Sequence, residues 1–277
     1  MIYEGILPKH DYAFGKIMED KETCKRFIEQ TLDIKIRDLV YLEKQKTLDP
    51  AIDVKGIRLD VFVEDDQNTV YNIEMQSANH DALPKRSRYY QGVMDVESLN
   101  RGGSYKDLPK CFVIFVCSFD PFGKRHMKYT FTNQCEEVSN LALDDGTTKI
   151  FLNTKGKNKK EVEPQLVQFL DFIQNSSGDH IQATTDPRIV NMYHHLETLK
   201  QRADMEADYM TTEERDRQIR EEGREEERLK LLTALISSKL NSGISPHAIA
   251  AELAPCFEME EDALLTRIAE IQTEFQN

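Results

Sequence analysis

The sequence of 277 residues has no apolar run that approaches the roughly eighteen residues needed to cross a membrane. Its first residues also lack the charged region and the long apolar stretch of a secretory signal peptide. We therefore expect a cytoplasmic protein without a membrane partner. A hydrophobic content of 39% and a charged content of 31% are typical of a soluble globular chain, long enough for one substantial domain and a smaller appendage.

Cysteine is scarce, and its spacing is uninformative. The five cysteines form no CxxC pair, so the sequence indicates neither a zinc site nor a disulfide framework. No Ser/His/Asp or Cys/His arrangement points to a nucleophilic enzyme, and no glycine-rich loop points to a nucleoside triphosphatase. A catalytic site in this chain would have to be of another kind.

Positive charge is also in short supply. The 36 lysines and arginines face 49 aspartates and glutamates, and the net charge of −13 opposes non-specific attraction to a polyanion such as DNA. Residues 200–277 contain 10 basic and 18 acidic residues, whereas residues 1–199 contain 26 and 31, so the tail is more acidic per residue. Two basic segments, 124–128 and 155–160, are either nucleic-acid contacts or solvated loops.

Two short runs rich in β-branched and aromatic residues, 58–63 and 70–76, flank a polar turn and predict a β-hairpin. Gln67, inside that turn, is midway between Asp60 and Glu74. With a loop of odd length, or with a bulge, these two carboxylates lie directly opposite each other, with Cβ atoms about 5 Å apart. Glu74 and Gln76 share a face of the strand because they are two residues apart.

Two carboxylates this close repel each other and raise each other's pKa unless a positive charge lies between them. A divalent cation such as Mg²⁺ or Mn²⁺ supplies that charge, and both ions favour carboxylate, carbonyl and water oxygens. Acidic residues on a solvated strand face are the ordinary alternative. The apolar residues around the hairpin favour the metal site, because buried charges need partners.

Several motifs, taken together and in order, resemble one family. They are Lys9-His10-Asp11-Tyr12-Ala13-Phe14-Gly15-Lys16, Tyr71-Asn72-Ile73-Glu74-Met75-Gln76, Arg88-Tyr89-Tyr90-Gln91 and Tyr105-Lys106-Asp107-Leu108-Pro109. With Asp60, they resemble the PD-(D/E)XK nuclease superfamily and, more narrowly, its Rpn-type recombination-promoting nucleases, also described as PD-(D/E)XK family transposases. The resemblance covers about residues 5–175. Leu59 stands in place of the signature proline, and Gln76 in place of the lysine.

This resemblance implies an α/β fold, a restriction-endonuclease-like PD-(D/E)XK core with a mixed central sheet flanked by helices, plus an all-α C-terminal tail. The residue patterns themselves predict helical structure over residues 10–32, as one helix or as two short helices broken near Asp20. They also predict helices over 81–99 and 165–173, and strands over 37–46, 111–117 and 149–153. We expect a nuclease-like domain over residues 1–178, a charged helical linker over 179–228 and a small helical module over 229–277.

The resemblance also implies roles for individual residues. Asp60, Glu74 and the backbone carbonyl of Met75 would hold Mg²⁺ or Mn²⁺. Asp11 is the candidate for a further ligand, and capping a helix is its alternative role. Gln76 would orient the attacking water or contact the phosphate. The residues expected to bind the DNA backbone are Lys9, Lys16, Arg86, Tyr90 and Gln91, although a solvated helix face with Tyr90 packed inward fits residues 85–91 equally well.

The leading hypothesis is a metal-dependent DNA endonuclease that hydrolyses phosphodiester bonds in recombination, mobile-element or defence biology. Its partner would be DNA, with a protein partner or self-association through the C-terminal helices as a further expectation. The alternative is a catalytically inactive nuclease-fold protein that binds DNA or protein. The departure at Gln76 is what keeps this alternative open.

Overall fold

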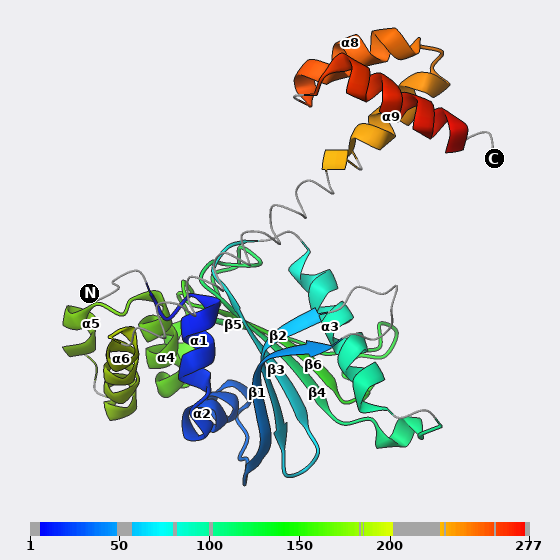
Figure 1. Ribbon diagram of the computed structural model, residues 1–277. Helices are drawn as coiled ribbons and strands as arrows, with labels where there is room; N and C mark the ends of the chain where they lie inside the picture. The colour runs from blue at the N-terminus through cyan, green and yellow to red at the C-terminus, as the bar shows by residue number, and fades with distance from the viewer. Residues whose placement is uncertain are drawn as a thin grey trace. The chain divides into compact units, whose positions relative to one another are not determined.

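The computed structural model describes residues 6–48, 57–79, 82–99, 102–182, 184, 186–201, 228–229, 231–257 and 259–274. These belong to two compact units, Met1–Glu206 and Ala207–Asn277. The first unit contains the hairpin predicted from the sequence, and its elements are shown in Figure 1.

A six-stranded sheet forms the centre of the first unit, with the strand order β1-β2-β3-β4-β6-β5. The antiparallel part comprises β1 (Leu39–Leu48), β2 (Ile57–Asp65) and β3 (Val70–Gln76). The parallel part comprises β3, β4 (Cys111–Cys117) and β6 (Thr147–Asn153), and β5 (Lys128–Phe131) pairs antiparallel with β6 at the edge. The sheet is therefore mixed, as predicted for an α/β fold of this type.

Helices cover both faces of this sheet (Figure 1). On one face lie α1 (Asp11–Met18), α2 (Lys21–Leu32), α4 (Pro164–Gln174) and α6 (Pro187–Lys200), and on the other lies α3 (Leu83–Ser98). The expected helix over residues 10–32 is broken near Asp20, whose side chain caps α2 by accepting a hydrogen bond from the Thr23 amide at 2.8 Å. The helices leave the central strands out of contact with water.

Strand β4 shows this burial most clearly. Its sequence is apolar throughout, as expected for a strand covered on both faces, and six of its seven residues are buried. Cys111 and Cys117, at its two ends, are buried thiols, like Cys24 in α2, whereas Cys256 is exposed. Burial raises the pKa of Cys111 and Cys117 to about 12, so both remain protonated at neutral pH.

Two features of the first unit differ from the sequence predictions. Strand β5 was not predicted, because it has only four residues, none of them buried, and directly follows a basic cluster. Helices α5 (Gly178–Gln182) and α6 belong to the first unit, where α6 packs against α1 and α4. The unit therefore extends beyond the boundary expected at residue 178, and most of the expected charged linker, residues 202–227, lies outside the described residues.

The second unit is helical in its described part and has its own apolar core. Residues 231–241 form a helix, followed by α8 (Pro246–Cys256) and α9 (Glu261–Glu274). Ser245 caps α8 through the Ala248 amide. The buried core residues include Leu232, Ile236, Ile249, Leu253, Leu264 and Ile268. Among the described helices of the chain, none has the length and apolar character to span a bilayer.

Candidate active site

The hairpin β2–β3 brings Asp60 and Glu74 together. Backbone pairing between these strands runs from Glu64↔Val70 to Val61↔Ile73 and continues no further. Beyond the last paired residues, backbone amides bond to the two carboxylates instead of to backbone carbonyls. The Asp60 amide donates to Glu74 Oε1 at 3.1 Å, and the Met75 amide donates to Asp60 Oδ2 at 2.9 Å. The two strands part at this point, and the carboxylates occupy the gap.

Glu74 is a buried carboxylate with one cationic neighbour. Its side chain is 1% exposed, and Arg86 Nη2 lies 3.4 Å from its Oε2. Burial raises the pKa of Glu74 to about 7, against the opposing effects of the Arg86 guanidinium and the Asp60 amide. At neutral pH a large fraction of Glu74 is therefore protonated unless a cation binds beside it.

The surroundings of Asp60 also disfavour its ionised form. Its side chain is half-buried at the surface of the gap. Burial raises the pKa of Asp60 well above its ordinary value, and the negative charges of Glu74 and Asp11 raise it further. The hydrogen bond from the Met75 amide and the charge of Arg86 only partly offset these effects. The site thus has more negative charge than the fold neutralises.

Arg86 connects most of the other predicted site residues. Its Nη1 donates to Gln76 Oε1 at 3.1 Å, and its Nε donates to the Tyr90 hydroxyl at 2.9 Å. Gln76 Nε2 in turn donates to the Met75 carbonyl at 2.8 Å. A planar guanidinium can bind several oxygens in fixed directions, so this one residue sets the position of Gln76 while it neutralises Glu74.

Tyr90 supports Arg86 from within the core. It is 8% exposed, and its ring stacks on Phe115 with the ring centroids 6.2 Å apart. The Arg86 guanidinium carbon lies 5.2 Å from the centroid of the Tyr90 ring. Burial raises the pKa of Tyr90, so its hydroxyl stays protonated and accepts the Arg86 hydrogen bond. Tyr90 is packed inward, with its hydroxyl bonded to Arg86.

The remaining predicted residues are divided between the site and its surroundings. Asp11 is the first residue of α1, whose N-cap is His10, so Asp11 is not the cap. Its charge raises the pKa of both Asp60 and Glu74, which places it beside the pair. Lys9 is half-buried just before α1. Two predicted DNA contacts have carboxylate neighbours instead: Lys16 with Glu19 at 3.5 Å, and Gln91 with Asp95.

The oxygens gathered here suit a hard divalent cation. Two carboxylates, a backbone carbonyl and the nearby Asp11 are the ligand types that Mg²⁺ and Mn²⁺ prefer. Within the described residues, no group of three His, Cys, Asp or Glu side chains could hold a metal ion, so Asp11 does not form a three-carboxylate ligand set with Asp60 and Glu74. The Met75 carbonyl and water would have to complete the coordination. Burial is the main cause of the raised pKa values of Asp60 and Glu74, and a cation bound beside them would lower both.

Asn72 is a site residue that the sequence interpretation missed. Its side chain is fully buried two residues before Glu74, on the same face of β3, and within the described residues neither its amide nitrogen nor its oxygen has a partner with full hydrogen-bond geometry. Its proximity lowers the pKa of Glu74. The alternating polar residues Asn72, Glu74 and Gln76 in an otherwise apolar strand were the available signal, because buried polar groups normally require partners.

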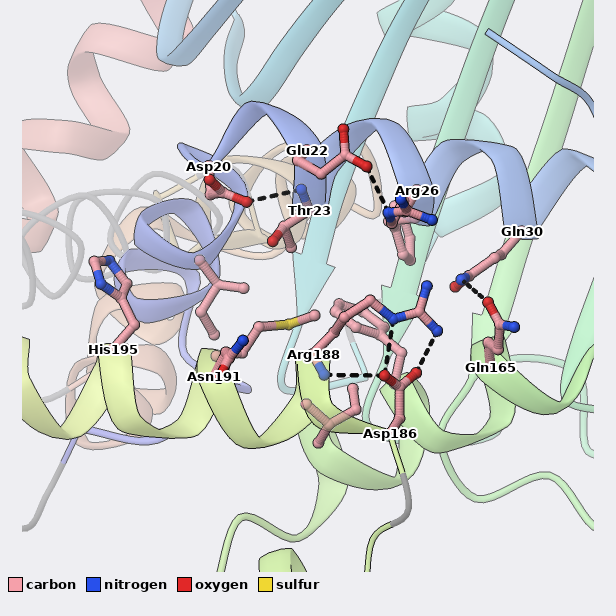
Figure 2. Close-up of a pocket in the computed structure, with 15 residues that line it drawn as sticks. Asp20, Glu22, Thr23, Arg26, Gln30, Gln165, Asp186, Arg188, Asn191 and His195 are labelled. Atoms are coloured by element: carbon pink, nitrogen blue, oxygen red, sulfur yellow. Dashed lines mark hydrogen bonds and ion pairs between the residues drawn. The ribbon is translucent and has the colours of Figure 1, made fainter.

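A separate pocket of about 500 Å³ lies among α2, α4 and α6 (Figure 2), and neither Asp60 nor Glu74 lines it. Two arginines line it, and each is neutralised within the chain: Arg26 by Glu22 at 2.5 Å, and Arg188 by Asp186 at 2.5 Å. The amides of Gln30 and Gln165 bond to each other at 2.8 Å. Both arginines of this pocket and the amides of Gln30 and Gln165 are thus already paired within the chain.

Comparison with known proteins agrees with the geometry of the fold. A family model described as PD-(D/E)XK nuclease family transposase matches residues 8–230, which include the whole sheet and every candidate site residue. No curated protein and no solved structure matches the chain significantly. The mixed six-stranded sheet with helices on both faces is consistent with the nuclease fold of that family. By this match, the chain belongs to the PD-(D/E)XK nuclease family transposases.

Proposed function

We propose that this protein is a divalent-metal-dependent DNA endonuclease. The observation that carries the proposal is the convergence of Asp60 and Glu74 where β2 and β3 part, in a site where burial raises the pKa of both carboxyls. Membership in a nuclease family makes DNA the expected substrate. The family's transposase description also supports a role in recombination, mobile-element or defence biology.

Asp60, Glu74 and the Met75 carbonyl would hold the cation, Mg²⁺ or Mn²⁺, and Asp11 would add negative charge nearby. When bound, such an ion lowers the pKa of a coordinated water and polarises the scissile phosphate. The protein supplies the rest from β3 and α3. Gln76 offers an amide that can orient the water, and Arg86 offers a guanidinium that can bind a phosphate oxygen in place of Glu74.

The contact between Arg86 and Glu74 suggests how the site would respond to a bound cation. Without one, Arg86 is the positive charge closest to Glu74, at 3.4 Å and with imperfect hydrogen-bond geometry for a charge pair. A divalent cation at Glu74 would repel the guanidinium and take over its neutralising role. Arg86 is 33% exposed, so its side chain can turn toward a bound phosphate.

The replacement of the signature lysine by Gln76 affects how well the proposed site can stabilise the transition state. A lysine at this position would place a fixed charge near the attacking water and the phosphate, whereas glutamine supplies only a dipole. In this chain Arg86 donates directly to Gln76, so a guanidinium already lies where the lysine charge would lie. Arg86 therefore compensates for the missing lysine.

Plasmid nicking tests the proposal. We expect the wild-type protein to relax supercoiled plasmid with Mg²⁺ or Mn²⁺ but not with EDTA. Asp60→Ala should lose at least about 10³-fold in rate, since it removes a ligand. Glu97→Ala is the matched control, because Glu97 is an exposed carboxylate on α3 outside the site. Equal nicking by wild type and Asp60→Ala would refute the proposal.

The second candidate is a catalytically inactive nuclease-fold protein that binds DNA or another protein. Gln76 in place of lysine favours it, as does the existing pairing of Arg86 with Glu74. The second unit could serve a protein partner or self-association, since Leu231 in its first described helix is 56% exposed. Binding of duplex DNA without metal-dependent nicking would favour this candidate over the endonuclease.

A further inference from the structure

The carboxyl ends of three parallel strands meet at one edge of the sheet. Gln76 at the end of β3 is level with Cys117 at the end of β4, and Cys117 is level with Asn153 at the end of β6. Neighbouring strands lie about 4.8 Å apart, so the end of β6 lies about 10 Å from the end of β3. The loops that follow β4 and β6 therefore begin beside the candidate site.

Hydrogen bonds attach the first of these loops to the site strand. The Ser118 amide donates to the Gln76 carbonyl at 3.0 Å, and the Ser118 hydroxyl donates to the Ser77 carbonyl at 2.8 Å. The Thr154 amide, which begins the second loop, donates to the Cys117 carbonyl at 3.0 Å. Both loops thus have a fixed starting position relative to Gln76.

The two loops also pack on each other, although more than 25 residues separate them in sequence. The Lys157 amide donates to the Arg125 carbonyl at 2.8 Å, and the Met127 amide donates to Asn158 Oδ1 at 2.7 Å. Gly156 lies so close that a Cβ there would come within 2.5 Å of Met127 backbone atoms. The buried Asn153 side chain donates to the His126 carbonyl at 3.0 Å. The two basic segments of the sequence therefore form one surface.

This surface is positive, although the protein as a whole is negative. Residues 120–128 and 153–163 contain seven lysines and arginines and three aspartates and glutamates, against 36 and 49 in the whole chain. Lys159 pairs with Asp171, and Lys128 donates to the Thr31 carbonyl. The Asp120 carboxylate accepts hydrogen bonds from the amides of Phe122, Gly123 and Arg125 and from the Tyr129 hydroxyl.

Five cations of this surface remain available to a ligand. They are exposed, and none pairs with a carboxylate in the part of the chain that the structure describes: Lys124, Arg125, Lys155, Lys157 and Lys160. Exposed lysines and arginines along one edge attract phosphates, and their density is the electrostatic mark of a nucleic-acid surface.

We propose that Lys124, Arg125, Lys155, Lys157 and Lys160 form a phosphate-binding surface that holds the backbone of duplex DNA on the β6 side of the candidate site. The inference rests on the proposed function for the identity of the polyanion. It also accounts for DNA binding by a protein with a net charge of −13, because the positive charge is concentrated at the edge where the substrate would lie. The contacts are to phosphates, so binding through them is independent of sequence.

Fluorescence anisotropy with a labelled 30-base-pair duplex in EDTA measures this binding without cleavage. The test variant is the triple Lys124→Gln, Lys155→Gln, Lys157→Gln in the full chain. The matched control is the triple Lys35→Gln, Lys106→Gln, Lys110→Gln, which removes three exposed lysines elsewhere and gives the same net charge. A third variant, with arginine at positions 124, 155 and 157, keeps the charge and tests whether the lysine side chains matter only to folding.

We expect the test triple to weaken binding at least about 10-fold, and to reduce the slope of log Kd against log salt by about 2 to 3. The control triple should stay within about twofold of wild type, and the arginine variant should bind like wild type. Equal affinity of the test and control triples for the duplex would overturn the proposed phosphate-binding surface. Failure of the wild-type protein to bind the duplex would overturn it as well. If the wild-type protein binds DNA through these lysines but does not nick plasmid, the phosphate-binding surface is supported and the proposed endonuclease function is refuted.

Discussion

The two ends of the β2–β3 hairpin each bury carboxylates, but they satisfy them differently. At the turn end, Asp65 is 6% exposed and accepts hydrogen bonds from the Gln67 amide at 2.9 Å, the Thr69 amide at 2.9 Å and the Tyr71 hydroxyl at 2.7 Å. Burial raises the pKa of Tyr71, with Asp65 as its next cause, which keeps this hydroxyl a donor. The chain itself supplies the partners of Asp65.

At the other end, Asp60 and Glu74 lie close together, and the donors to them among the described residues are two backbone amides and, at 3.4 Å, Arg86. Burial raises the pKa of both carboxyls, and the charge of Glu74 raises that of Asp60 further. A buried carboxylate is therefore not by itself a functional signal. The two ends differ in how many hydrogen-bond donors the fold provides to the carboxylates. A cation stabilises ionised carboxylates most where such donors are few.

The largest expected effect separates the two ends by activity. Glu74→Ala removes a proposed ligand and should reduce metal-dependent nicking by at least about 10³-fold. Asp65→Ala removes a turn contact, so nicking per folded molecule should stay within about threefold of wild type. Both rates are measured at one temperature, after the folded fraction has been determined by circular dichroism. A comparable loss of activity in both variants would remove the distinction.

The next effect concerns Gln76 at the site end. Gln76→Ala removes the acceptor of Arg86 and the donor to the Met75 carbonyl, and should lower nicking about 10- to 1000-fold. Gln76→Lys restores the charge of the family signature and should preserve or raise the rate, with Arg86 moving aside for the new cation. Single-turnover nicking rates of the two variants test this role of Gln76. If Gln76→Ala nicks plasmid as fast as wild type, another group positions the water.

Stability should change in opposite directions at the two ends. Asp65→Ala leaves two backbone amides and a buried hydroxyl without their acceptor and should cost about 3 kcal/mol. Asp60→Asn removes one of two neighbouring carboxylates and should raise the free energy of unfolding slightly. Such gains are common at functional sites, where activity is maintained at some cost in stability. Urea unfolding in EDTA measures both. Destabilisation by Asp60→Asn as large as that by Asp65→Ala would show that Asp60 is a structural carboxylate.

The smallest effect is a pH dependence specific to the site end. Burial raises the pKa of Glu74 from 4.5 to about 7, so between these values the folded protein binds more protons than the unfolded chain. The stabilisation is fully present below pH 4.5 and is lost as the pH rises through 7. Asp60 contributes in the same direction. Urea unfolding from pH 4.5 to 8 in EDTA should show this decline, and Glu74→Gln should flatten it.

The sequence was sufficient to predict the hairpin geometry. The spacing about Gln67 placed Asp60 across from Glu74, and the structure has that register with five residues, 65–69, between the last paired residues Glu64 and Val70. The apolar run of β4 and the helix of α3 were also predictable, because local pattern and burial agree in both. Metal ligation and DNA contact by the site residues stay predictions.

The rest depends on tertiary packing that no local pattern encodes. The contacts of Arg86 with Glu74 and Gln76 require α3 to lie over the end of β3, and the inward packing of Tyr90 follows from Phe115 beneath it. The two basic loops resembled ordinary solvated segments in the sequence. Their union depends on the parallel register of β4 and β6, which is set by pairing between segments distant in the chain.

Strand β4 gives the protein an internal reporter of its own opening. Thiolate is the reactive form of cysteine, and a thiol with a pKa of about 12 at Cys117 alkylates very slowly in the folded state. Cys256 is exposed, so a maleimide or iodoacetamide reagent should modify it long before the core thiols. Because Cys117 is level with Gln76 across the β3–β4 pair, the rate of its alkylation reports how often the site edge separates. Ligands that bind across that edge should therefore protect Cys117 while leaving Cys256 labelling unchanged.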